Sequence, residues 1–106
     1  MSIITLTTDY GNRDYAVGAL HGAIRRLHPN PIIEDICHTI EPFDVGEGTY
    51  ILSHAAREFP PNTVHVFGVN STWGPNNPHL AARYNDQFFI SADNGFFHLL
   101  TSVKNA

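Results

Sequence analysis

The chain has 106 residues, a length typical of one domain, and 42% of them are hydrophobic. Ten acidic residues against six lysines and arginines give a net charge of -4, and without a basic patch we expect no nucleic-acid binding. No apolar run approaches the ~20 residues of a membrane span, and the N-terminus has no signal-type segment. Because Cys37 is the only cysteine, no internal disulfide can form, and we expect a cytoplasmic protein.

The first strand and helix are expected near the N-terminus. Residues 3–8 are β-branched and apolar without alternation, which predicts a strand buried on both faces of a parallel sheet. After a turn, Asp14 stands where an N-cap accepts the first free N–H groups of a helix. Apolar residues then recur at helical spacing and predict a face packed on the sheet: Val17, Leu20, Ile24 and Leu27. Gly18 and Gly22 would allow close approach to the sheet, and the helix should stop at Pro29.

A second strand, a second helix and a third strand follow. Residues 32–36 predict a short strand, and residues 45–56 predict a helix that ends before the next prolines. Asp44 and Glu47 have capping-box spacing, with Asp44 as the N-cap and Glu47 reaching back to it. Residues 63–69 are again apolar and predict the third strand.

The C-terminal part predicts a β-hairpin. Residues 80–84 and 87–91 flank the turn pair Asn85-Asp86, and residues 96–100 form a short apolar element. We therefore expect one α/β domain over residues 1–106, with three layers, a mostly parallel sheet, crossover helices and a C-terminal hairpin.

In such a sheet the carboxyl ends of the parallel strands share one edge, where ligands bind. Three loops should meet there, after residues 8, 36 and 69. Asp9 ends the first strand, and its carboxylate suits either a ribose diol or the N–H groups of its own turn. Asp14 suits either helix capping or the binding of an ammonium group. Phe43 and Trp73 either stack on a base or sugar or close the core, and for Phe43 we favour the core.

Other chemistries have less support. Among seven histidines no pair has metal-ligand spacing, so no metal site is expected. His65 lies mid-strand and is expected to be a buried, hydrogen-bonded residue. Cys37 and His38 should point to opposite faces of their strand, which disfavours a thiol–imidazole pair. Asp35 lacks a preceding G-x-G-x-x-G, so a nicotinamide or flavin site is not expected.

Four segments resemble, in order, the motifs of the S-adenosyl-L-methionine (SAM) hydroxide adenosyltransferases, the SAM hydrolases related to fluorinase and chlorinase. They are residues 3–11 (IITLTTDYG) with Asp14, 35–44 (DICHTIEPFD), 59–66 (FPPNTVHV) and 92–95 (ADNG). The resemblance implies the family's N-terminal α/β domain and displacement at the ribose C5′ of SAM. It also implies SAM as the substrate, no cofactor, and a homotrimer with its active site between subunits.

The resemblance assigns roles to four residues. Asp9 would hold the two ribose hydroxyls, and Asp14 would hold the methionine ammonium group. Phe43 would lie against the sugar, and Asn94 would sit at the edge of the site.

The loop after the third strand departs from the family's hydrolases. They carry an Asp and an Arg there for activating water, and the matching positions here are Asn70 and Asn77. An Asn orients water but does not take its proton. The third member of the family's set, a His, would lie beyond this chain. His79 is a candidate base, the alternative being a loop histidine in solvent.

The family's C-terminal β-rich domain is not among these 106 residues, so we expect a fragment or a domain that cannot complete the site alone. The predicted function is hydrolysis of SAM to adenosine and methionine. The alternatives are a catalytically weak domain that binds SAM or adenosine, and an inactive fragment.

Overall fold

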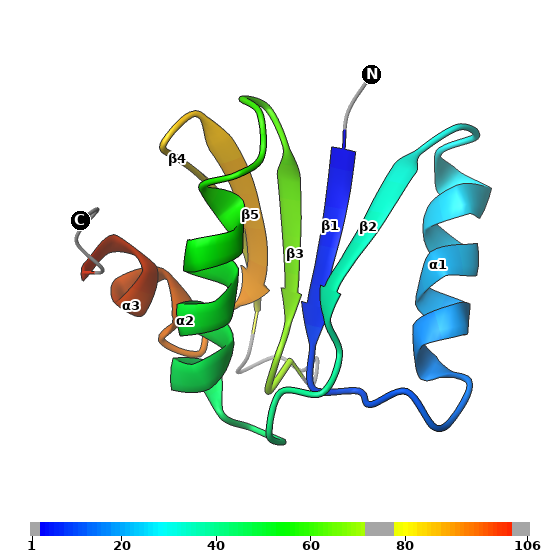
Figure 1. The fold of residues 1–106 in the computed structure, drawn as a ribbon, viewed down its shortest axis with the longest axis horizontal. Helices are drawn as coiled ribbons and strands as arrows, with labels where there is room; N and C mark the ends of the chain where they lie inside the picture. Colours follow the sequence, from blue (N-terminus) through cyan, green and yellow to red (C-terminus); the bar gives the residue numbers. More distant parts are fainter. Residues whose placement is uncertain (1–2, 72–77, 103–106) are drawn as a thin grey trace.

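Apolar strands alternate with helices along the chain, and together they build a five-stranded sheet with helices on both faces (Figure 1). The computed structural model describes residues 3–71 and 78–102. The strands are β1 (Ile3–Thr8), β2 (Ile32–Cys37), β3 (Val64–Gly68), β4 (His79–Tyr84) and β5 (Gln87–Ala92). The helices are α1 (Ala16–Leu27), α2 (Val45–Ala56) and α3 (Phe96–Ser102). None of the helices in these described ranges has the length and hydrophobicity that a bilayer span requires.

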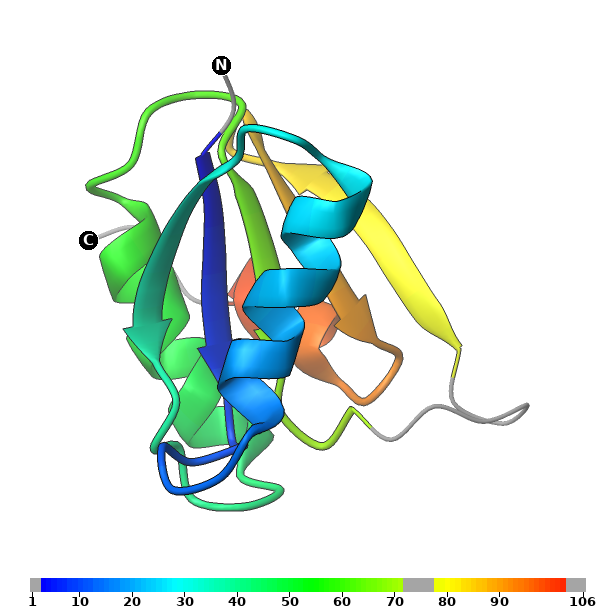
Figure 2. The ribbon, with the colours of Figure 1, turned by 90° about the vertical axis from the view of Figure 1, so that its right-hand side faces the viewer.

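The strand order is β2-β1-β3-β5-β4, and only β4 runs antiparallel. Helix α1 lies on one face of the sheet, with α2 and α3 on the other (Figure 2). The predicted α/β class, mostly parallel sheet and C-terminal hairpin are therefore confirmed. The order reverses between β1 and β3, and such a switch point is where open α/β sheets bind ligands.

The hairpin turn has the predicted chemistry. Asn85 and Asp86 have φ angles of 51° and 62°, and a two-residue type I′ turn needs this left-handed conformation at both positions. The turn pairs Tyr84 with Gln87 and sets the antiparallel register of β4 on β5. Because β4 runs back along β5, its first residue lies at the carboxyl edge of the parallel strands.

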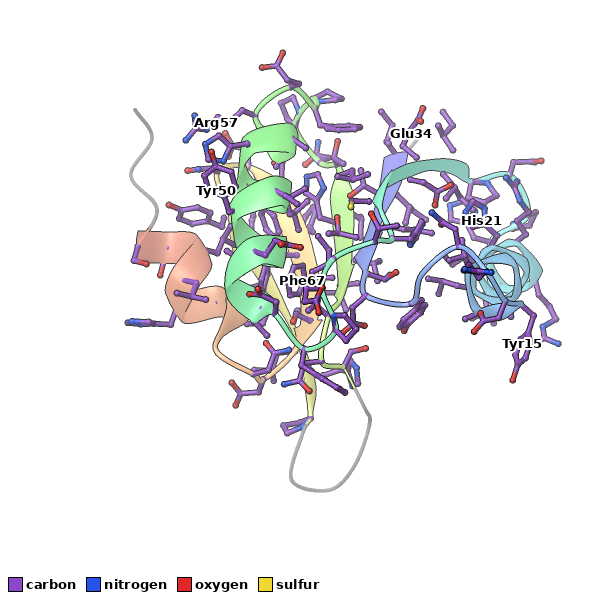
Figure 3. The ribbon with its side chains drawn as sticks, turned by 60° about the horizontal axis from the view of Figure 1, so that its bottom comes forward. Tyr15, His21, Glu34, Tyr50, Arg57 and Phe67 are labelled. Atoms are coloured by element: carbon purple, nitrogen blue, oxygen red, sulfur yellow. The ribbon has the colours of Figure 1, made fainter. Side chains whose placement is uncertain are left out.

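The core lies between the sheet and the pair α2 and α3. Phe67 of β3 stacks on Phe96 of α3 with ring centroids 4.2 Å apart, and Phe67 lies beside α2 in Figure 3. Gly48 makes this contact possible, since a Cβ there would lie 2.8 Å from the Phe67 ring. Close helix-to-sheet packing therefore occurs in α2, at a glycine that the sequence pattern did not single out.

Helix α1 differs from the prediction in its packing. It has no fully buried residue, and Leu27 is 87% exposed, so the expected apolar face covers the sheet only in part. A Cβ at Gly18 or Gly22 would meet no atom within 4 Å, so the close approach predicted for these glycines is wrong. Spacing placed both glycines on one side of the helix, but that side faces away from the sheet.

The two predicted helix caps are partly right. The N-cap of α1 is Tyr15 rather than Asp14, although Asp14 Oδ1 still accepts from the Ala16 N–H at 2.8 Å. Asp44 caps α2 as predicted, accepting from the Glu47 N–H at 2.9 Å. The return bond of a capping box is absent among the described residues, because the Asp44 N–H donates to the Glu41 carbonyl.

Candidate functional site

The site is built around Asp9, the residue that follows β1. Its Oδ2 accepts the main-chain N–H of Phe43 at 2.9 Å and that of Asn70 at 3.1 Å. One carboxylate oxygen therefore joins the segments that follow β1, β2 and β3 at the switch point of the sheet. The other oxygen, Oδ1, accepts no hydrogen bond from the residues that the structure describes. The side chain is half-buried, and the fold uses one of its two oxygens for both of these bonds.

A cavity of about 580 Å³ opens beside Asp9, within the size range of small-molecule sites. Its walls are residues 9–14 of the β1–α1 loop and residues 38–42 of the β2–α2 loop. Asp9, Asp14 and Glu41 contribute carboxylates to this wall, against the single cation Arg13. The excess of negative charge suits a ligand that carries hydroxyl donors or a positive group.

Phe43 follows the last wall residue, Pro42, and it is 69% exposed. The interpretation of Phe43 as a core residue is therefore wrong. Its φ of 67° is rare for a bulky residue and costs conformational energy. With this backbone the Phe43 N–H donates to Asp9 while the aromatic ring stays outside the core.

Asn70 and Asn94 form the other side of the switch point. Asn70 has a left-handed backbone with φ 50°. The Asn94 side-chain amide donates to the carbonyls of Val69 at 2.8 Å and Asn70 at 3.2 Å. Asn94 Oδ1 accepts from the Phe96 N–H at 3.2 Å. Asn94 therefore fixes the segment whose N–H reaches Asp9.

The remaining predicted site residues lie further along the same edge or outside the described structure. His79 is the first residue of β4, is exposed and pairs with Ala92 of β5. Asn77 and Trp73 lie outside the residues that the structure describes.

A hydrogen-bond network that the sequence did not reveal adjoins Asp9 through the buried residues Thr8 and His38. His38 is 6% exposed, and its ring joins Asp35 Oδ1 through Nε2 and Thr8 Oγ1 through Nδ1, both at 2.7 Å. Asp35 also accepts from His21 Nε2 of α1 at 2.9 Å; Figure 3 labels His21. Burial acts to raise the pKa of Asp35, but the hydrogen bonds from His38 and His21 outweigh it and lower the pKa.

Two predictions about sulfur and imidazole groups can be compared with the structure. Cys37 Sγ lies 3.5 Å from Thr39 Oγ1, while the neighbouring His38 ring bonds to Thr8 and Asp35, so the two side chains do not act as a pair. His65 is fully buried, as predicted. Within the described ranges, no cluster of three or more His, Cys, Asp or Glu side chains is arranged to hold a metal ion.

Comparisons with known proteins identify the family of this chain. Residues 4–106 match the model of the SAM hydroxide adenosyltransferase N-terminal domain. The (R)-S-adenosyl-L-methionine hydrolase of Methanocaldococcus jannaschii is 35% identical over 102 residues, which cover 92% of this chain and 38% of that protein. A fluorinase of Nocardia brasiliensis is 39% identical over 81 residues, covering 76% of this chain and 27% of its own length.

Solved structures show the same fold. An uncharacterized conserved protein from Thermotoga maritima superimposes with a TM-score of 0.82 at 35% identity, covering 93% of this chain and 38% of the other. A conserved hypothetical protein from Thermus thermophilus gives a TM-score of 0.78 at 27% identity, covering 93% and 41%. The chain thus spans well under half the length of these proteins. It belongs to the SAM hydroxide adenosyltransferase family, and it corresponds to the family's N-terminal domain.

Proposed function

We propose that this chain contributes the ribose-binding part of a site that hydrolyses SAM to adenosine and L-methionine. One observation carries the proposal: Asp9 is held at the β1/β3 switch point by two main-chain amides on Oδ2, beside a cavity of small-molecule size. The printed name of the hydrolase relatives, (R)-S-adenosyl-L-methionine hydrolase, supports SAM as the substrate.

Three residues would hold the substrate. The Asp9 carboxylate accepts hydrogen bonds from the 2′- and 3′-hydroxyls, since an ionised carboxylate is an acceptor with several lone pairs. Asp14, in the wall of the same cavity, supplies the negative charge for the methionine ammonium group. The exposed Phe43 ring lies against the sugar.

The reaction is a single displacement. An oxygen–carbon bond forms between water and C5′ while the carbon–sulfur bond breaks, and the sulfur leaves with the electron pair as the neutral thioether of methionine. The sulfonium needs no acid to leave, so the protein contributes alignment of C5′ with a water that is shielded from bulk solvent. In this proposal Asn70 and Asn77 orient the water, and His79 takes its proton.

A domain that binds SAM or adenosine with little turnover is the second candidate. The observation in its favour is that the N–H and the carbonyl of Asn70 are both engaged within the protein, with Asp9 and Asn94, and an Asn side chain takes no proton. Such a domain would sense or sequester its ligand.

The test is incubation of the chain with SAM and chromatographic measurement of adenosine and methionine. Formation of both products in equal amounts, lost in Asp9→Asn, supports hydrolysis. Formation of a 5′-halo-adenosine when fluoride or chloride is added would instead indicate halide as the nucleophile. Binding without products, seen as a thermal shift with SAM or adenosine, supports the second candidate. Ligand at 100 times its Kd should add about 2.7 kcal/mol to the free energy of unfolding.

The trimer that the resemblance implies and a cytoplasmic location belong to the same proposal. Analytical ultracentrifugation of the chain tests the first, and cell fractionation tests the second.

A further inference from the structure

The His38 ring is bonded on both nitrogens, and each bond reaches a different strand. Nε2 lies 2.7 Å from the Asp35 carboxylate of β2, and Nδ1 lies 2.7 Å from the Thr8 hydroxyl of β1. The carbonyl of His38 also accepts the Gly11 N–H at 2.7 Å. One buried residue thus fastens the β2–α2 loop to both sides of Asp9.

The Asp35 partner defines one end of the chain of bonds. An ionised carboxylate only accepts, so Nε2 of His38 carries a hydrogen and donates it to Asp35, while Nδ1 bonds the Thr8 hydroxyl. The Thr8 oxygen in turn accepts the Tyr10 N–H at 3.2 Å. The main-chain N–H groups of Tyr10 and Gly11 are therefore both fixed by way of His38.

This arrangement has the connectivity of a carboxylate–imidazole–hydroxyl triad, but it does not supply a nucleophile. Thr8 is fully buried, and its methyl group lies against β3, 3.0 Å from where a Cβ on Gly68 would stand. No substrate atom can approach such a hydroxyl. What the network can do is hold the residue next to Thr8, which is Asp9.

The network also fixes the far end of the cavity wall. Asp35 binds His21 of α1 through both carboxylate oxygens, at 2.9 and 3.1 Å. Helix α1 has no fully buried residue, and this polar contact ties its middle to β2. The β1–α1 loop, which carries Asp9 and Asp14, is therefore bonded to His38 directly, while the helix that follows it is bonded to Asp35 through His21.

We propose that His38 is a positioning residue of the adenosyl site. It orients the Asp9 carboxylate toward the ribose diol through Thr8 and the main-chain N–H groups of Tyr10 and Gly11. The inference rests on the proposed function, because it needs a ribose at Asp9. It adds a residue of the cavity wall whose ring is buried and bonded to Thr8 and Asp35. His38 acts through its neighbours, so its loss should weaken recognition of the diol specifically.

The test compares the affinities of adenosine and 2′,3′-dideoxyadenosine, which lacks the diol, by NMR titration of four proteins. These are wild type, His38→Gln, Thr8→Val and the control His98→Gln. The Gln amide can place a donor where Nε2 stands, but its acceptor is also at the end of the side chain and not at the δ position from which the ring bonds Thr8. Thr8→Val removes the hydroxyl with little change of shape. His98 is an exposed histidine of α3, far from the β1–α1 loop along the sheet.

We expect His38→Gln and Thr8→Val each to lower the affinity for adenosine about tenfold or more, the effect of weakening a hydrogen bond to a charged group. The affinity for dideoxyadenosine should not change, and His98→Gln should match wild type. The double variant should be no weaker than the weaker single variant, because both changes break the same chain of bonds.

Unchanged adenosine binding in both variants would overturn the inference. An equal loss of affinity for both ligands would also overturn it, since that indicates general damage to the site rather than a changed orientation of the Asp9 carboxylate. Failure of the proposed function is read separately, from wild type alone: a wild-type chain that binds the two nucleosides equally makes no contact with the diol. Thr8→Val keeps the imidazole and its bond to Asp35, so it provides the answer if His38→Gln does not fold.

Discussion

The main-chain N–H of Phe43 donates to Oδ2 of Asp9 at 2.9 Å, and this bond joins two loops that are 34 residues apart in the sequence. It shows how a carboxylate can serve the fold and a ligand together. One oxygen organises the carboxyl edge of the sheet, and the side chain as a whole is not sealed in. It also explains why a bulky residue keeps a φ of 67° at this position.

The strain at Phe43 leads to a paired prediction. Phe43→Gly removes the ring and the strain, whereas Phe43→Ala removes the ring and keeps a Cβ in the left-handed region. Chemical denaturation should show the Gly variant to be more stable than the Ala variant by about 1 kcal/mol. Both should bind adenosine more weakly than wild type. Equal stability of the two variants would mean that the positive φ at residue 43 carries no strain.

Glycines in the two long helices should respond in opposite ways to alanine. Gly48→Ala places a methyl group 2.8 Å from the Phe67 ring and should destabilise the chain by about 1–3 kcal/mol through overpacking. Gly18→Ala enters open space in α1 and should stabilise by up to about 1 kcal/mol through helix propensity. Urea unfolding of both variants checks the contrast, and a destabilising Gly18→Ala would contradict the exposed position of that face.

Because His65 is buried, we expect the folded protein to lose stability in mild acid. Thr5 Oγ1 lies 2.6 Å from Nδ1, and Gln87 Oε1 lies 3.2 Å from Nε2. Burial lowers the pKa of His65 from its ordinary 6.5, and the hydrogen bond to Gln87 opposes this only in part. Below pH 6.5 the unfolded chain therefore takes up a proton that the folded chain excludes. The free energy of unfolding should fall as the pH drops from 6.5 to the lower folded pKa, and then level off for this group.

NMR titration of the imidazole resonances measures the His65 contribution directly, because each of the seven histidines gives its own signal. The His65 midpoint should lie below the ordinary value of 6.5. A midpoint for His65 at or above 6.5 would contradict the prediction.

Two adjacent acids of β2 form a further matched pair. Asp35→Asn removes the negative charge that accepts from His21 and His38, whereas Glu34→Gln changes an exposed side chain on the other face of the strand, labelled in Figure 3. Asp35→Asn should cost about 1 kcal/mol, since solvent partly screens the pair, and should raise amide hydrogen exchange throughout α1. Glu34→Gln should leave exchange unchanged. Equal protection of α1 in both variants would show that its packing, not Asp35, holds the helix.

The fold could be predicted largely because its signals are local. The Asn85-Asp86 turn and the Asp44 cap each depend on a few neighbouring residues, and both appear as expected. The β-α-β-α-β order then leaves few possible topologies. The wrong predictions concern contacts with residues that are distant in the sequence. Which side of α1 faces the sheet depends on how the helix packs on it, and the spacing of Gly18 and Gly22 alone does not determine this.

The candidate site could be predicted in position but not in detail. The carboxyl edge and Asp9 follow from strand order, and the amides that bind Asp9 come from loops 34 and 61 residues away. Thr8 and His38 are separated by 30 residues, so no spacing rule joins them. A histidine three residues after an aspartate at a strand end was the one local signal of that network.

The account depends on a ribose binding at Asp9, and adenosine titrated into the ¹⁵N-labelled chain tests this most directly. The amide resonances of Phe43 and Asn70, whose N–H groups donate to Asp9, should shift on binding. The same titration of Asp9→Asn, which keeps an oxygen for these amides but loses the charge, should leave both resonances unmoved. Adenosine that shifts only resonances of the β4–β5 hairpin, or that binds Asp9→Asn as well as wild type, would contradict the account.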